Sequence, residues 1–119
     1  MRTFRSALLI ISLSCVACDS SPIACTLLYA YGITATVTDP TNGGAIPNAT
    51  LTLTDGSYQE TMQHFGSDDY VGAGERAGTY TLTASAPGYE DKTIPNIVVT
   101  RDQCHVMGVH VDVQMQPSP

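Results

Sequence analysis

The sequence predicts an all-β protein, built as a two-sheet antiparallel sandwich. From Thr26 onward, apolar and polar residues alternate almost throughout, so side chains point in turn to a core face and a solvent face. Clusters of Gly, Pro, Asn and Asp interrupt the alternation at short intervals. No stretch of helical length has a 3.6-residue period. Strands with one buried face need a second sheet to cover that face, which favours a sandwich.

The first four strands are expected between residues 29 and 71. The first spans 29–38 and ends at the turn formers of 39–44. The second spans 49–54 and ends at Asp55-Gly56. A third is expected over 58–65, and a short fourth near Tyr70 and Val71, between Gly-rich turns. The residues expected to face the core from the first two are Tyr29, Tyr31, Ile33, Ala35, Val37, Ala49, Leu51 and Leu53.

The last three strands carry the same alternation. The fifth spans 79–86 and ends at Pro87-Gly88. The sixth spans 92–100 and contains Pro95, which cannot donate a ladder hydrogen bond and so indicates an edge position or a bulge. The seventh spans 109–115. The inward residues expected on the fifth and seventh strands are Tyr80, Leu82, Ala84, Ala86, Val109, Val111, Val113 and Met115.

Three stretches of this strand pattern resemble the carboxypeptidase regulatory-like domain. They are Ile33–Asp39, Ala45–Leu53 and Ala77–Tyr89, and the Gly-Thr-Tyr and Pro-Gly-Tyr elements of the last stretch are the most specific. The resemblance covers about Ile33 to Met115. It implies a seven-stranded antiparallel Greek-key sandwich of the transthyretin (prealbumin) type. It also implies a non-catalytic module, of the kind found beside enzymes, in surface proteins and in transport or adhesion machinery.

The N-terminus has the pattern of an export signal. Arg2 and Arg5 precede an apolar stretch, 7–17, that is too short to span a bilayer as a helix. Cys18 follows Cys15-Val16-Ala17, which resembles the lipobox of bacterial lipoproteins and implies that Cys18 is lipidated. Cys15 is the competing lipid site, and cleavage to a soluble product is a further alternative. The expected divisions are a signal at 1–17, a lipidated Cys and tether at 18–25, a domain at 26–116 and a tail at 117–119.

Two cysteines are left if Cys18 carries the lipid and Cys15 leaves with the signal. An exported chain with two cysteines most simply forms one disulfide, here between Cys25 and Cys104. Cys25 precedes the first strand and Cys104 precedes the last. With seven alternating strands, both of these strands start at the same end of the sandwich, whereas with six they would not.

Composition and spacing exclude several chemistries. The mature chain has three basic residues against eleven acidic ones, a formal charge of −8, so no nucleic-acid partner is expected. His64, His105 and His110 lack the spacing of a metal site, and no metal ligand is assigned. No serine or cysteine stands in a nucleophile motif. No catalytic residue and no cofactor is therefore expected.

The seven-strand topology gathers three acidic loops at the end of the domain away from the tether. We expect this distal end to contact a partner, or a Ca²⁺ ion, since oxygen ligands from separate loops suit a hard cation. The predicted function is a non-catalytic exported lipoprotein module, anchored to a bacterial membrane in the periplasm or at the cell surface, which contacts an envelope protein or a glycan. The alternative is a small metal-binding or enzymatic domain on the same fold. The candidate loop residues are Asp39, Asn42, Asp68, Asp69, Tyr89, Glu90 and Asp91.

Overall fold

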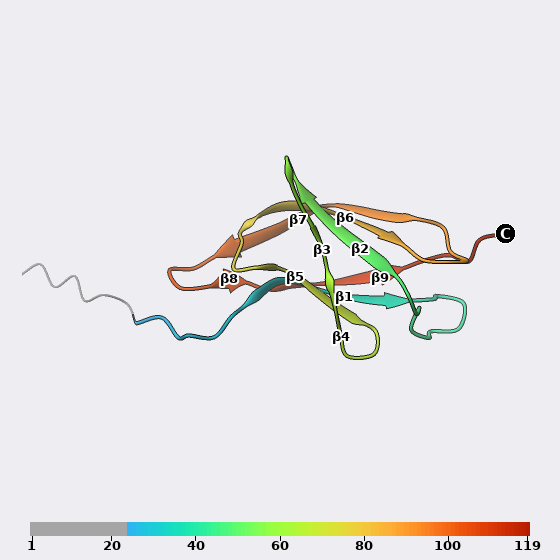
Figure 1. The fold of residues 1–119 in the computed structure, drawn as a ribbon, viewed down its shortest axis with the longest axis horizontal. Helices are drawn as coiled ribbons and strands as arrows, with labels where there is room; N and C mark the ends of the chain where they lie inside the picture. The colour runs from blue at the N-terminus through green and yellow to red at the C-terminus, as the bar shows by residue number, and fades with distance from the viewer. Residues whose placement is uncertain (1–23) are drawn as a thin grey trace, which may run out of the picture.

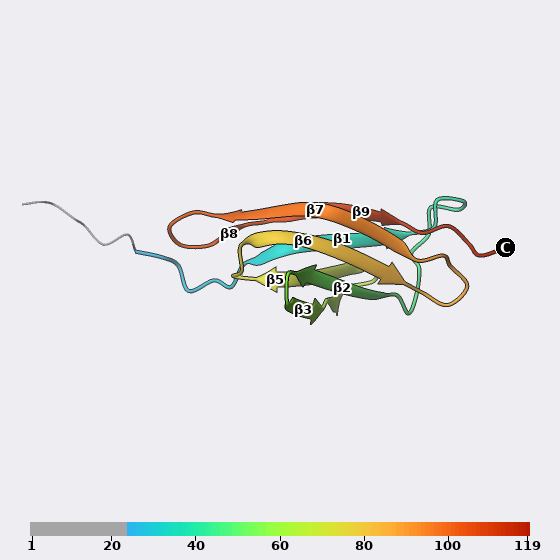
Figure 2. The same ribbon diagram turned by 90° about the horizontal axis from the view of Figure 1, so that it is seen from above.

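The computed structural model describes residues 24–119 as two β-sheets packed face to face (Figures 1 and 2). The first sheet has the order β4 (Gln63–Phe65), β5 (Asp69–Gly74), β1 (Tyr31–Thr38) and β9 (Val109–Gln114). The second has the order β3 (Tyr58–Thr61), β2 (Thr50–Asp55), β6 (Gly78–Ser85), β7 (Lys92–Arg101) and β8 (Val106–Met107). The predicted all-β sandwich is confirmed. Within residues 24–119, no helix has the length and apolar character needed to cross a membrane.

The core lies between the two sheets and contains most of the residues that the alternation placed inward. The strands β1, β2 and β6 bury alternate residues, while the threonines between them are half-buried or exposed. Tyr80 is the largest of these buried side chains. The other residues with no exposed surface include Ile33, Ala35, Val37, Leu51, Leu53, Leu82, Ala84, Val113 and Met115.

The chain passes from one sheet to the other at two breaks between short strands, and the first break divides a predicted strand. The strand expected over 58–65 breaks at Met62, so β3 pairs with β2 in the second sheet while β4 pairs with β5 in the first. Near the C-terminus, β8 pairs with β7 before Gly108, and β9 pairs with β1 after it. A Cβ atom at Gly108 would lie 3.1 Å from the Tyr31 carbonyl oxygen, so glycine allows the close approach at this crossing.

Pro95 lies at a β-bulge, which is one of the two positions that the sequence predicted, the other being an edge. In the pairing of β6 with β7, Tyr80 is opposite Ile97 and Leu82 is opposite Ile94, so the register shifts by one residue between them. Asn96 absorbs the shift with a positive φ of 60°. Because Pro95 has no pairing partner on β6 at the bulge, the ladder needs no hydrogen bond from its nitrogen.

One prediction about side chains was wrong. Tyr29 and Tyr31 have the parity of core positions, yet Tyr29 lies before β1 and both are exposed. At the start of β1, the opposite sheet is instead met by Gly32, where a Cβ atom would lie 2.8 Å from the Val99 side chain.

Residues 117–119 follow the last strand and contact the domain, since Pro117 bridges Tyr89 and the Ser118 N–H donates to the Gly88 carbonyl at 2.9 Å. The C-terminal residues therefore fasten the β6–β7 loop.

The first and last long strands run parallel and side by side. Ile33 is opposite Val109, and the register continues to Thr38 opposite Gln114. Both strands therefore start at the same end, where Cys25 and Cys104 form a disulfide with a Cα–Cα distance of 5.1 Å. The parallel placement that the seven-strand topology required is confirmed. Cys15 and Cys18 lie outside the described residues.

Candidate functional site

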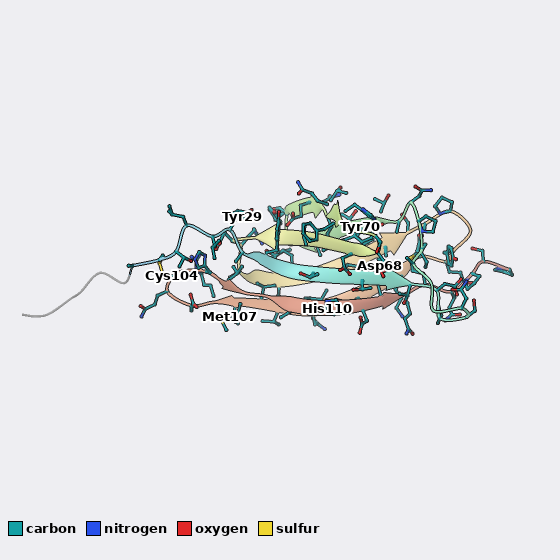
Figure 3. The ribbon with its side chains drawn as sticks, turned by 90° about the horizontal axis from the view of Figure 1, so that it is seen from below. Tyr29, Asp68, Tyr70, Cys104, Met107 and His110 are labelled. Atoms are coloured by element: carbon teal, nitrogen blue, oxygen red, sulfur yellow. A yellow bond between two sulfur atoms is a disulfide. The ribbon has the colours of Figure 1, made fainter. Side chains whose placement is uncertain are left out.

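The sandwich has two chemically different ends. The proximal end carries the Cys25–Cys104 disulfide and the turns that join β2 to β3, β5 to β6 and β7 to β8. The distal end carries the β1–β2, β4–β5 and β6–β7 loops. Figure 3 shows Cys104 at the end that the N-terminal segment reaches, and Asp68 farther along the molecule. The directions of the strands place the loops that carry the candidate residues at the end away from the N-terminal segment.

Asp39 and Tyr89 meet at the distal end and join two of its loops. The Tyr89 hydroxyl donates to Asp39 Oδ2 at 2.8 Å, and Thr41 donates to Oδ1 through both its N–H and its hydroxyl. The two bonds from Thr41 are the main cause that lowers the pKa of Asp39. The bond to Asp39 is in turn the main cause that raises the pKa of Tyr89. Asp39 is 5% exposed, so this pair holds the loops together and is not free to bind a ligand.

Three other candidate residues also have local partners. Asn42 Oδ1 accepts the Gly44 N–H at 2.8 Å and shapes the β1–β2 loop. Asp69 Oδ1 accepts the Thr36 hydroxyl at 2.6 Å across the first sheet. Asp68 accepts the Ser67 hydroxyl at 2.8 Å, and its backbone carbonyl accepts the Val37 N–H. These side chains shape and fasten the distal loops.

Glu90 and Asp91 form the part of the distal end that is open to a partner. Both are exposed, and among the described residues their carboxylates make neither a hydrogen bond nor an ion pair. The Glu90 N–H donates to the Gln116 carbonyl at 2.9 Å, which fixes the backbone of this turn against the C-terminal segment. A shallow pocket of about 270 Å³ results. It is lined by Glu90, Asp91, Lys92, Gln114, Met115 and Gln116.

This distal pocket has the chemistry of a polar recognition site. It offers two carboxylates, one ammonium and two amides, around the buried Met115. Lys92, Gln114 and Gln116 were not among the residues predicted from the sequence. Lys92 begins β7, Gln114 ends β9, and Gln116 follows it. The two glutamines lie beside Glu90 because the C-terminal segment packs on the β6–β7 loop.

Three of the five carboxylates in the candidate loops have partners within the protein. Within residues 24–119, no group of three or more His, Cys, Asp or Glu side chains is placed to hold a metal ion. Asp39 is occupied by Thr41 and Tyr89, and Asp69 by Thr36.

A second polar cluster lies on the outer face of the first sheet. His110 Nε2 is 3.2 Å from the Thr36 hydroxyl and 3.1 Å from Asp112 Oδ1. A nucleophile–base–acid arrangement needs the acid on the other ring nitrogen from the nucleophile. Here Nε2 contacts both, and the His110 side chain is 52% exposed, as its predicted outward position required. These residues form a solvated strand face.

A polar network closes the proximal end of the core and was missed by sequence reasoning. The Arg76 guanidinium contacts Asp55 at 3.0 Å, donates to the Tyr80 hydroxyl at 3.0 Å and lies 3.7 Å from the centre of the Tyr58 ring. Beside it, Glu75 accepts the Ala30 N–H at 2.8 Å. Glu75 Oε1 also lies 2.7 Å from His105 Nδ1. Each of these partners comes from a different strand or turn, so no local pattern in the sequence indicates the network.

The two-sheet sandwich, the parallel first and last strands and the loop-borne polar pocket define a transthyretin-like β-sandwich module. The family model of the carboxypeptidase regulatory-like domain matches residues 32–116. The chain therefore belongs to the carboxypeptidase regulatory-like domain family, whose members are non-catalytic β-sandwich modules. A comparison with curated proteins finds no match.

Proposed function

We propose that the protein is an exported lipoprotein, held to a bacterial membrane through Cys18, whose sandwich binds an envelope protein or a glycan through its distal end. The sandwich itself performs no catalysis. The observation that carries the proposal is the separation of the two ends. The disulfide ties the N-terminal segment to the proximal end, and the open polar pocket lies at the other end.

The disulfide supports export. Disulfides form and persist in oxidising compartments, such as the periplasm and the cell surface. Five of the eleven acidic residues lie in the distal loops, with Lys92 as the one basic residue there, and this balance supports a partner that is itself neutral or basic. A pocket with carboxylates, amides and one lysine suits the peptide groups of a protein or the hydroxyl groups of a glycan.

Photo-crosslinking in intact cells tests this assignment. A photoreactive phenylalanine analogue in place of Asp91 should give a discrete adduct, because that side chain lines the distal pocket. The same analogue in place of Gln59, an exposed residue of β3, is the matched control and should give none. Digestion of the adduct with protease or with glycosidase identifies the class of partner.

A charge variant supplies the second arm. Glu90→Gln combined with Lys92→Ala should reduce the yield of the Asp91 adduct, whereas Asp112→Asn, an exposed carboxylate on the outer face of the first sheet, should leave it unchanged. Equal adducts from positions 91 and 59, or no adduct from either, would contradict a partner at the distal end.

A further inference from the structure

The exposed apolar side chains of the described domain gather at its proximal end. The large apolar residues exposed in residues 24–119 lie there with one exception, Phe65, which is on β4. Figure 3 shows Tyr29 and Met107 in the same half of the molecule as Cys104. A single exposed leucine is ordinary, but exposed apolar residues collected in one region mark an interaction surface. The proximal group consists of Leu27, Leu28, Tyr29, Tyr31, Val98 and Met107.

The proximal carboxylates are already hydrogen-bonded or paired inside the protein. Asp55 is 3.0 Å from Arg76, and Glu75 bonds both His105 and the Ala30 N–H. Glu60 accepts the Ala73 N–H at 2.7 Å, and Asp102 accepts two N–H groups of the β7–β8 turn at 2.8 Å. The proximal end also carries Arg76 and Arg101 against these four acids. The distal loops have five acidic residues against Lys92 alone, so the proximal end approaches an anionic layer with less repulsion.

The chain length before the domain limits how far this end can stand from a lipid at Cys18. Cys25 is fixed to the domain by its disulfide, and it follows Cys18 by seven residues. A fully extended chain covers about 3.5 Å per residue, so the proximal end lies within about 25 Å of the anchored residue. Leu27 and Leu28 come directly after this short connection and are 104% and 76% exposed.

We propose that the proximal end rests on the lipid bilayer, with Leu28, Tyr29 and Met107 in the interfacial layer. This inference rests on the lipid anchor of the proposed function and adds a fixed orientation to it. Tyrosine is enriched at membrane interfaces because its ring is apolar and its hydroxyl is wetted, and leucine and methionine gain by leaving water. The long axis of the sandwich then points away from the membrane and presents the distal pocket outward.

Single-tryptophan fluorescence tests this orientation, because the protein contains no tryptophan of its own. We would prepare the lipidated full-length mature protein as Leu28→Trp, Met107→Trp and Phe65→Trp, and reconstitute each in phosphatidylethanolamine–phosphatidylglycerol vesicles. Phe65 is the matched control, an exposed apolar side chain (64%) outside the proximal group. In the first two proteins, emission should shift to shorter wavelength and be quenched by brominated lipid. In the Phe65→Trp protein it should do neither.

The outcomes separate this inference from the anchor. Vesicle flotation without quenching in the Leu28→Trp and Met107→Trp proteins would overturn the orientation and leave the lipoprotein assignment standing. Equal quenching at all three positions would also overturn it, because the domain would lie without a preferred end. A blue shift without quenching by brominated lipid would indicate contact with a second copy of the chain and refute the bilayer as occupant. Failure to float would remove the anchor, and the orientation with it.

Discussion

Removal of the Cys25–Cys104 disulfide should cost a large part of the stability of this domain. The bond closes a loop with a sequence separation of 79 residues. On the chain-entropy model, a loop of this length restricts the unfolded chain by about 4.5 kcal/mol at 25 °C. Domains of this size have a free energy of unfolding of about 5–15 kcal/mol. The Cys25→Ala, Cys104→Ala protein should therefore melt roughly 20–35 °C lower than the native protein, at about 4–8 °C per kcal/mol.

Urea unfolding of both proteins, followed by circular dichroism, measures the effect. The midpoint should fall in the double variant. The slope of free energy against urea should rise, because an unfolded chain without the cross-link exposes more surface. A reductant should lower the midpoint of the native protein and leave that of the double variant unchanged. Peptide mapping without reductant establishes that the bond is present. A loss below about 1 kcal/mol would refute the entropic argument, since the unfolded chain would then be about as restricted without the bond as with it.

Three further predictions concern the anchor, the acid response and the distal loops. Cys18→Ser should move the protein from the membrane fraction to the soluble fraction or leave it as uncleaved precursor, and if Cys15→Ser has that effect instead, the lipid site is Cys15. The pKa of Asp39 is lowered in the folded state, so its contribution to stability is present above the unfolded pKa of about 4 and is lost as pH falls through the folded value. The urea midpoint should accordingly fall between pH 6 and pH 3, and Asp39→Asn should flatten this decline; an identical decline in the variant would assign it to other carboxylates. A ligand that prefers the native state must raise the melting temperature. Because Asp39 and Asp69 already have partners in the protein, addition of Ca²⁺ to the mature domain should leave the melting temperature unchanged. A rise that depends on Asp68 and Asp69 would restore the cation interpretation.

The alternation in the sequence predicted the strands well, because the core is two layers deep and every long strand has one buried face. It could not reveal that one strand changes sheets at Met62. Tyr58 and Glu60 of β3 are half-buried and Met62, which follows β3, is buried, whereas all three residues of β4 are exposed. The alternation therefore continues up to the crossing, and nothing in it marks the change of sheet. Period two reports which side a residue faces and not which sheet it belongs to.

The candidate site was predicted in outline and not in detail. The strand directions were enough to place the acidic loops together at one end. They could not separate Asp39, whose partner Tyr89 is 50 residues away, from Glu90 and Asp91, which remain open to solvent. The exposure of Tyr31 was missed for a related reason. Parity makes Tyr31 an inward residue, but at the start of β1 the buried Gly32 is the residue that meets Val99 of the opposite sheet, and this contact depends on packing between distant strands.

The parallel pairing of β1 with β9 has a mechanical consequence. Residue 24 leaves the sandwich at one end and residue 119 at the other, as the two views of the ribbon show (Figures 1 and 2). The disulfide passes tension from Cys25 to Cys104 and then along β9, so the covalent chain carries the load between these points. With the bond closed, the pairs from Ile33–Val109 to Thr38–Gln114 are shielded from the pull. After reduction, the same pull would run along both parallel strands and shear these pairs together.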